Sequence, residues 1–520
     1  MTDRLALAAL ALSSSLLWAA GAVEAQTVAA PEAVAAAAVP VRASADPDLR
    51  ARVRLAEAWL ATQLAGEGVP GAAYAIVFDQ ETLAARGLGH ADEARRVPVT
   101  ADTRFSVCSI SKLFTSIAVM QERDSGRLNL DAPIETYVPW ARLAPVPGAA
   151  GGPEPVTARA ILSHVSGLPR EVDLPYWRQA RFPDTAAVRS RVSTQAMLYR
   201  PFDTYQYSNL GMTLVAEAAA ATSGLDYHAL LKSRILDPLG LRSTTSELPN
   251  TLRGRDFAVG WTARRTGWDR TTFEPYTLSG IAPAAGFASS ARDLGRFAAW
   301  QFRVLAGGGD EVLKASTLRE MHRAHWVAPD RPDQMWGLGF RVANLNGKTV
   351  VGHGGWCPGY RSALLLRPQD RLAVALLTNA DDADAQALAE GMWELVLSDA
   401  SRIASGKPAP PRTRDLSAFE GVYGTRRSAS DMAVVQVENE LLSLPLFVRR
   451  NLVQAIDRWK PAGPDRFHRV LPGGGQGDEL RFERDARGRI VRLWVHSNPL
   501  ERMDGPAVTP PPTPRAAIAP

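Results

Sequence analysis

Strand-length apolar runs occur at two places that lie far apart in the chain, and this separation most limits how the chain can fold. Two runs lie at 73–78 and 82–87, and three more fall within 349–377. The residues between them have mostly helical and loop-like patterns, and an amphipathic helix is expected around 388–396. Strands at both ends, with helices between and outside them, predict a sheet completed by distant parts of one chain. We therefore expect an α/β layered domain over residues 51–400.

The pattern changes after this domain. Residues 401–414 are rich in proline and are predicted to form a linker. Short β-prone runs separated by turn signals then fill 415–503, which predicts a small antiparallel β domain, either a barrel or a curved sheet. The last residues, 504–520, are Pro-rich and are expected to be disordered.

The first residues indicate export. Residues 1–25 have Arg4 near the start, an apolar stretch, and a small-residue cleavage pattern before Gln26, as in a secretory signal peptide. The alternative is a short membrane anchor, but the apolar stretch is shorter than the roughly 20 residues that a spanning helix needs. Residues 26–50 are expected to be a flexible lead-in. No later segment is long and apolar enough to span a bilayer, so we expect a periplasmic or secreted protein without a transmembrane segment after signal cleavage.

Composition excludes several classes of protein. The chain has 520 residues, 46% of them hydrophobic, which is enough for a large core and excludes a disordered tail protein. Its formal charge of +5 comes from 59 basic and 54 acidic residues without a long basic run, so no nucleic-acid partner is expected. His322 and His325 are three apart but lack an acidic or Cys partner at ligand spacing, so we predict no metal site.

Ser109 and Lys112 form the first of three patterns that suit nucleophilic catalysis. They are three apart at the start of an apolar helical pattern, so both side chains fall on one face of a helix. A serine hydroxyl is a weak nucleophile until a base accepts its proton, and a buried lysine can do so once its pKa is lowered. The alternative is an ordinary capped helix, because this spacing also occurs by chance.

Tyr207 and Asn209 form the second pattern, in a loop just before a helix. A tyrosine hydroxyl beside a lysine can act as phenolate or as proton relay, and an asparagine amide can hold both the lysine and a substrate amide. The alternative is a loop tyrosine packed by its ring, with the asparagine closing a turn.

The third pattern is an apolar strand that ends in two glycines. It comprises Val350, Val351, Gly352, His353, Gly354, Gly355 and Trp356. Small residues allow a substrate backbone to lie against a strand edge, and the amide after the glycines could donate to an oxyanion. The alternative is a strand that runs into a glycine turn.

Taken together, Ser-x-x-Lys, Tyr-x-Asn and a strand-borne His-Gly-Gly resemble the penicillin-recognising serine hydrolases, whose third element is commonly Lys-Thr-Gly. More narrowly, the set is similar to the class C β-lactamase-like group, which includes D-amino-acid peptidases, DD-carboxypeptidases and serine esterases. The stretches 162–169 and 283–294 are also similar to segments usual in that group. The resemblance covers roughly 50–400 and implies a cofactor-free domain with an antiparallel sheet, flanking helices and a helical region. The 415–503 region looks like the β-rich appendage of some such hydrolases.

The resemblance implies a role for each residue of the three patterns. Ser109 would be the acylated nucleophile, Lys112 its proton partner, and Tyr207 the base or relay. Substrate would be bound by Asn209, His353, Gly354 and Gly355, and the oxyanion by the backbone N–H groups of Ser109 and Trp356. His353 departs from the usual lysine and is largely neutral at pH 7, so it attracts a substrate carboxylate less strongly. Arg361 could restore a positive charge there, or could have a surface role.

The resemblance also bears on the cysteines, because the implied fold brings Cys108 and Cys357 close to the nucleophile. We predict a disulfide between them; the alternative is two separate buried thiols.

The function that these features predict is an exported serine hydrolase that works through a Ser109 acyl-enzyme. Its substrates would be small molecules or short peptides, with β-lactams or D-alanyl and D-amino-acid peptides as the first classes and small esters as the alternative. A further alternative is a non-catalytic wall-binding protein, although such a protein usually loses the Ser, Lys or Tyr that this chain retains. The sequence leaves the oligomeric state open.

Overall fold

The computed structural model describes residues 42–147, 154–329, 331–345, 347–425 and 431–503. The expected signal peptide (1–25) and C-terminal tail (504–520) lie outside these residues. No helix in the described ranges is both long enough and apolar enough to cross a membrane.

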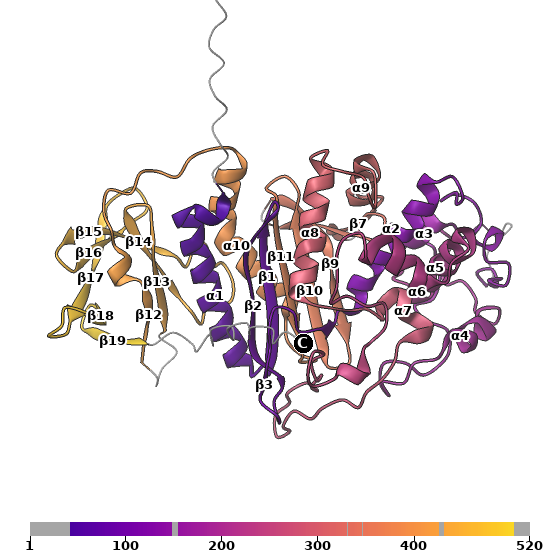
Figure 1. Cartoon of the computed structure of the whole chain (residues 1–520), viewed down its shortest axis with the longest axis horizontal. Coiled ribbons are helices and arrows are strands. Elements are labelled where there is room, and N and C mark those ends of the chain that lie inside the picture. Colours follow the sequence, from indigo (N-terminus) through magenta and orange to yellow (C-terminus); the bar gives the residue numbers. More distant parts are fainter. Residues whose placement is uncertain (1–41, 148–153, 330, 346, 426–430, 504–520) are drawn as a thin grey trace, which may run out of the picture. The chain divides into compact units, whose positions relative to one another are not determined.

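Among the described residues, nine strands form one antiparallel sheet in the order β3-β2-β1-β11-β10-β9-β8-β7-β6. Its strands are β1 (Gly71–Phe78), β2 (Glu81–Asp92), β3 (Val97–Pro98), β6 (Trp326–Ala328), β7 (Arg331–Trp336), β8 (Arg341–Leu345), β9 (Lys348–Cys357), β10 (Tyr360–Arg367) and β11 (Leu372–Thr378). Strand β1 pairs with both β2 and β11, so the indigo and orange parts of the chain lie side by side in Figure 1. The prediction of a sheet completed by distant segments is confirmed.

Helices cover both faces of this sheet. On one face lie α1 (Pro47–Glu67) and α10 (Ala385–Ala404), and on the other lies α8 (Ala291–Leu305), which leads into the helical region. Strand β1 is buried along its whole length because its alternate side chains enter both cores: Tyr74 and Ile76 pack on the α1 side, and Ala75 and Val77 on the α8 side. The two cores therefore share the sheet as their common wall.

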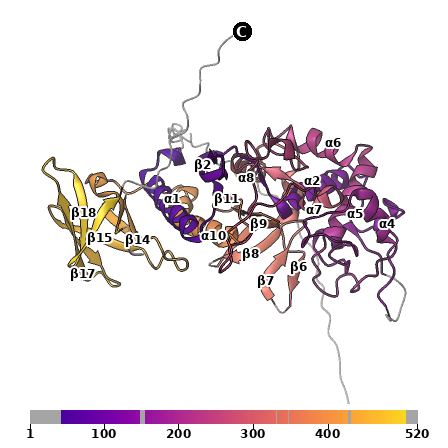
Figure 2. The same cartoon turned by 90° about the horizontal axis from the view of Figure 1, so that it is seen from below.

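The helical region follows β3 and returns before β6 (Figure 2). Its helices are α2 (Ser111–Asp124), α3 (Ala158–Leu162), α4 (Thr185–Val192), α5 (Asn209–Ser223), α6 (Tyr227–Leu231), α7 (Ala282–Ala285) and α9 (Ala315–His322). A two-stranded sheet of β4 (Phe105–Ser106) and β5 (Ala288–Ser289) lies just before α2 and α8 respectively. Helix α2 is buried on nearly all sides, which makes it a rigid base for the residues at its amino end.

Within the described C-terminal residues, eight strands close into an antiparallel barrel. They are β12 (Gly421–Gly424), β13 (Met432–Val437), β14 (Glu440–Pro445), β15 (Asp457–Gly463), β16 (Arg466–Val470), β17 (Gln476–Arg484), β18 (Ile490–Val495) and β19 (Asn498–Met503). Its core is filled by large side chains that include Tyr423, Trp459 and Phe482. Of the two forms expected for this β domain, the barrel is the one found.

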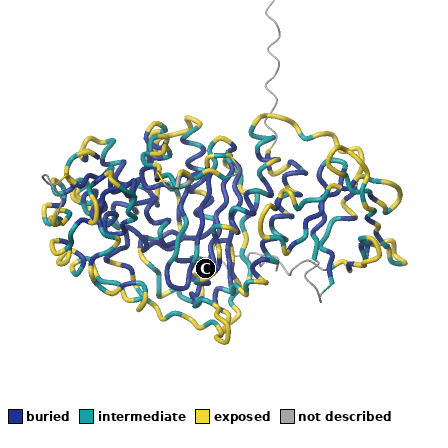
Figure 3. The backbone as a smooth tube through the Cα atoms, turned by 180° about the vertical axis from the view of Figure 1, so that it is seen from behind, coloured by how far each residue is buried: buried dark blue, intermediate teal, exposed yellow. Residues whose placement is uncertain are grey.

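Two expected boundaries differ from the structure. Helix α1 begins at Pro47, inside the predicted lead-in (26–50), because Asp46 caps it and Leu49 is fully buried in the core. Helix α10 runs to Ala404, inside the predicted linker (401–414), and buries Ala400 against the same core. In Figure 3 both helices carry buried segments next to the sheet. The apolar residues were too sparse there to show a helical period in the sequence.

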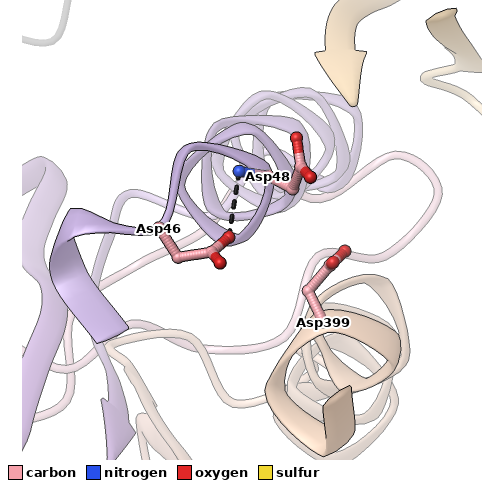
Figure 4. A group of neighbouring side chains, drawn as sticks. All are labelled: Asp46, Asp48 and Asp399. Carbon is pink, nitrogen blue, oxygen red and sulfur yellow. Dashed lines mark hydrogen bonds between the residues drawn. The ribbon is translucent and has the colours of Figure 1, made fainter. Parts of the chain in front are cut away.

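Three buried carboxylates meet beside these two helix ends: those of Asp46, Asp48 and Asp399 (Figure 4). Their spacing would suit a cation, but arginines already oppose them. Arg402 contacts both Asp46 and Asp399, at 2.7 and 3.2 Å, and Arg412 contacts Asp48 at 2.6 Å. The cluster therefore has the chemistry of an ion-pair network that joins α1, α10 and the segment after α10.

Candidate active site

Ser109 and Lys112 meet at the start of α2, as their spacing predicts. A short 3₁₀ turn (Cys108–Ile110) carries Ser109, and the helix that follows carries Lys112, whose side chain is fully buried. The Lys112 Nζ lies 3.2 Å from the Ser109 Oγ. It also donates to the Asn209 Oδ1 and to the Ala284 carbonyl oxygen, both at 2.8 Å. Three oxygen atoms therefore hold the lysine, and one of them belongs to the expected nucleophile.

The surroundings of Lys112 favour its neutral form. Burial lowers the pKa of Lys112 well below its usual range, and the positive charge of Arg170 lowers it further, although Glu171 opposes this. A neutral amine has two hydrogens and one lone pair. The Asn209 and Ala284 oxygens can only accept hydrogen bonds, so they take the two hydrogens. The lone pair then faces the Ser109 hydroxyl, which is the arrangement that a general base requires.

Tyr207 contacts the same serine. Its hydroxyl donates to the Ser109 Oγ at 2.9 Å, and the Lys112 Nζ lies 4.7 Å from the centre of its ring. Burial raises the pKa of Tyr207, and the hydrogen bond to Ser109 and the charge of Arg170 lower it by less. The phenol therefore keeps its proton at neutral pH, so the structure favours the relay over a resting phenolate.

Asn209 holds the lysine as expected, but its amide has a second partner that the sequence did not indicate. The Asn209 Nδ2 donates to the Glu171 Oε1 at 2.6 Å, and the Trp177 Nε1 donates to the same oxygen at 2.8 Å. Glu171 follows Arg170, which lies 3.3 Å from it. No sequence pattern singles out this acid, because only the fold brings its loop to Asn209.

Strand β9 places its glycines on opposite faces. A Cβ on Gly355 would lie 2.3 Å from the Val107 carbonyl oxygen and 3.1 Å from the Cys108 Cβ, so only glycine lets the strand lie against the turn that carries the nucleophile. A Cβ on Gly354 would instead lie 3.3 Å from the Gln386 Oε1 of α10. Gly355 thus borders Ser109, whereas Gly354 faces the helix behind the sheet.

His353 is buried and uncharged. Burial lowers the pKa of His353 to about 3. Its Nδ1 hydrogen-bonds to the Gly354 carbonyl oxygen, so the proton is on Nδ1 and the Nε2 lone pair is free to accept. Among the described residues, that Nε2 has no partner. The ring lies next to those of Tyr207 and Trp336, with centroids 6.4 and 5.5 Å away.

The structure contains the predicted disulfide between Cys108 and Cys357, whose Cα atoms are 5.7 Å apart. Each cysteine is the sequence neighbour of a residue expected to donate to the oxyanion, Ser109 and Trp356. The Trp356 Nε1 also donates to the Asp381 Oδ1 at 2.9 Å. Both expected donors are thus tied to rigid partners.

Arg361 belongs to the surroundings of Trp356. Its guanidinium lies 5.5 Å from the centre of the Trp356 ring and donates to the Asp381 carbonyl oxygen at 2.6 Å. The arginine therefore packs against Trp356 and is held there by the segment that follows β11.

An aromatic wall that the sequence did not indicate stands beside Trp356. Trp177 stacks on Trp356 with centroids 5.5 Å apart, and Phe182 contacts both Trp177 and Tyr276. All four rings remain partly exposed. They come from separate segments of the chain, so no local sequence period could reveal them.

Comparison with known proteins agrees with this geometry. The family model described as Beta-lactamase matches residues 56–397. The chain therefore belongs to the beta-lactamase family, whose members are serine hydrolases.

Individual relatives resemble parts of the chain. A D-aminopeptidase of Gluconobacter oxydans (strain 621H) is 27% identical over 348 residues, which cover 62% of this chain and 59% of that protein. The chain thus matches less than two thirds of that relative. The octameric penicillin-binding protein homologue from Pyrococcus abyssi aligns with a TM-score of 0.58 and 23% identity, over 86% of this chain and 99% of that one. The D-amino acid amidase from Ochrobactrum anthropi SV3 aligns with a TM-score of 0.54 and 24% identity, over 68% and 99%. At these identities the two structures show the fold alone.

Proposed function

We propose that this protein hydrolyses the amide bond that follows a D-amino-acyl group with a free amino end, in D-aminoacyl amides or short D-peptides. The charge pattern around Ser109 is the observation that carries this proposal. The carboxylate of Glu171 is joined to Lys112 through Asn209 and is contacted at 3.3 Å by the half-exposed Arg170, whereas His353 is uncharged. Such a site suits a substrate ammonium better than a substrate carboxylate. The D configuration is taken from the D-aminopeptidase and D-amino acid amidase similar to this chain.

The residues support an acyl-enzyme mechanism. Lys112 takes the proton of the Ser109 hydroxyl as Oγ bonds to the substrate carbonyl carbon, and the backbone N–H groups of Ser109 and Trp356 stabilise the oxyanion. The C–N bond then breaks, and the leaving amine receives a proton from Lys112 through the Tyr207 hydroxyl. Water, deprotonated by the same pair, attacks the ester, releases the D-amino acid and returns a proton to Ser109.

The aromatic wall supplies a place for the substrate side chain. Trp177 donates to Glu171 and stacks on Trp356, so the wall connects the proposed ammonium site with the proposed oxyanion site. A D-amino acid with an apolar or aromatic side chain would place its ring on these indoles while its amino group reaches Glu171.

Export is part of the proposal. The signal-peptide pattern at 1–25 and a disulfide next to the nucleophile both suit an oxidising compartment, in the periplasm or outside the cell.

The test compares the p-nitroanilides of D-phenylalanine, L-phenylalanine and N-acetyl-D-phenylalanine on the mature protein. We expect the free D compound to be cleaved fastest. Glu171→Gln should raise its KM by roughly 10-fold, the loss of about 1.4 kcal/mol of ion pairing, without a comparable rise in the KM of the acetylated compound. An effect transmitted through Asn209 to Lys112 should change kcat for both compounds alike. Asp173→Asn, two residues away, is the matched control. Equal cleavage of the free and acetylated compounds would refute the ammonium site.

A second experiment, with penicillin, distinguishes a peptidase from a β-lactamase. The protein is incubated with excess penicillin, and its intact mass and the remaining penicillin are recorded. A lasting adduct on Ser109 would indicate a penicillin-inhibited peptidase, and consumption of penicillin by unmodified protein would indicate a β-lactamase. Failure to cleave any of these compounds would favour an ester substrate or a non-catalytic binding role.

A further inference from the structure

His164 brackets Tyr207 from both sides along the chain. Its carbonyl oxygen accepts the Gln206 N–H at 2.8 Å, and its Nδ1 accepts the Ser208 N–H at 3.3 Å. Between these two bonds, the imidazole lies on the Tyr207 ring, with centroids 4.3 Å apart and planes inclined by 34°. One residue therefore fixes the backbone before Tyr207, the backbone after it, and the ring itself.

The backbone of His164 has a conformation that is unfavourable for a bulky residue. Its φ of +57° lies in the left-handed region, just after the end of α3, where glycine or asparagine is the usual residue. A bulky side chain persists in such a conformation only where its surroundings hold it. The imidazole is almost completely buried, and it lies in a T-shaped contact with Trp336, with ring centroids 4.7 Å apart.

The hydrogen bond from Ser208 fixes the tautomer of the imidazole. Because Nδ1 accepts, the ring proton is on Nε2, and this buried atom has no partner among the described residues. Burial lowers the pKa of His164 well below its usual range, and the charge of Arg170 acts in the same direction. A neutral ring is what this arrangement requires, since an imidazolium has a proton on both nitrogens and could not accept the Ser208 N–H.

We propose that His164 is the positioning residue for Tyr207: its carbonyl oxygen and Nδ1 hold the loop so that the Tyr207 hydroxyl meets the Ser109 Oγ. The inference rests on the proposed function, because it concerns the relay that serves the same nucleophile. A merely structural histidine would stabilise the domain without changing how fast Ser109 reacts once the protein has folded.

The test uses a fluorophosphonate probe, which reports the reactivity of Ser109 whatever the natural substrate is. His164→Gly keeps the backbone carbonyl and tolerates the positive φ, but it removes the ring. We expect it to slow the maximal labelling rate by at least about 10-fold, because a misplacement of about 1 Å can cost on the order of 100-fold, while half-saturation by the probe stays unchanged. His164→Asn also tolerates this φ, and its Oδ1 can replace Nδ1 as acceptor, so it should recover most of the rate.

A double-mutant cycle with Tyr207→Phe separates positioning from general stability. If His164 acts through the Tyr207 hydroxyl, His164→Gly should change the labelling rate less than about 2-fold in the Tyr207→Phe background. Equal slowing in both backgrounds, or wild-type labelling by His164→Gly, would overturn the proposal. Should His164→Gly fail to fold, His164→Ala is measured against His164→Asn with the same criteria. A wild-type protein whose Ser109 does not label would overturn the proposed function and the role of His164 with it.

Discussion

The large polar side chains of the barrel core and the polar side chains around Ser109 differ in how they are buried. In the barrel core, the Tyr423 hydroxyl donates to the Phe419 carbonyl oxygen and the Trp459 Nε1 donates to the Ser443 Oγ, each at 2.8 Å. Around Ser109, the Nε2 atoms of His164 and His353 are buried without partners among the described residues, and Lys112 is buried as well. A buried polar atom without a partner costs roughly 1–3 kcal/mol. Unpartnered buried atoms also occur elsewhere in the described residues, for example the Trp393 Nε1 and, in the barrel, the His468 Nδ1. The comparison teaches that what sets the surroundings of Ser109 apart is the kind of group buried there: titratable side chains that lie beside the nucleophile.

The substitution Ser109→Ala should abolish catalysis without affecting the stability of either domain. The rate of D-phenylalanine p-nitroanilide cleavage should fall by at least about 10⁴-fold, because the covalent step is lost. The melting temperature should change little, since Ser109 and Tyr207 are only partly buried and water can take the place of the lost acceptor of the Tyr207 hydroxyl. Ser233→Ala, at an exposed serine, is the control and should change neither quantity. Cleavage at the wild-type rate by Ser109→Ala would contradict the acyl-enzyme mechanism.

Lys112→Met tests whether the buried lysine is the base. It should lower kcat by at least roughly 100-fold, the usual contribution of a positioned proton acceptor. Only the neutral amine can accept the serine proton, so the wild-type rate should rise as pH rises through the lowered pKa of Lys112, and then level off well below the usual lysine range. The residual rate of Lys112→Met should lack this rise. A rise that persists unchanged in the variant would assign the titration to another group.

Much of the fold and most of the expected site could be read from sequence because the signals were local. The spacing of Ser109 and Lys112 needs only a helix, and the position of Gly355 needs only the strand that carries it. Glu171, Trp177 and His164 could not be assigned roles in the same way. The roles proposed for them depend on loops that meet Asn209, Trp356 and Tyr207 in space, and the sequence around them has no periodic pattern that would predict such contacts.

Replacing both Cys108 and Cys357 by serine should change both the stability of the hydrolase domain and the reactivity of Ser109. The bridge joins residues separated by 249 positions, so its loss should lower the free energy of unfolding by about 2–5 kcal/mol. Urea unfolding measures this change. Fluorophosphonate labelling of the folded variant should slow by roughly 10-fold, since Ser109 and Trp356 lose the bond that holds their segments together. Unchanged labelling would mean that the packing at Gly355 alone positions the nucleophile.

Trp459→Phe tests how much a satisfied hydrogen bond in the barrel core contributes to stability, and it has the smallest expected effect. It keeps most of the ring contacts but leaves the buried Ser443 hydroxyl without its donor, so the free energy of unfolding should fall by about 1–3 kcal/mol. The rate of substrate cleavage should stay within 2-fold of wild type, roughly the scatter of such measurements, because the residue contacts no group of the site. Trp494→Phe, whose partly exposed Nε1 donates to Glu483, is the control and should cost less. If Trp459→Phe slowed cleavage more than about 10-fold while the protein stayed folded, the barrel would influence the catalytic step. The barrel core could then no longer be treated as energetically separate from the residues around Ser109.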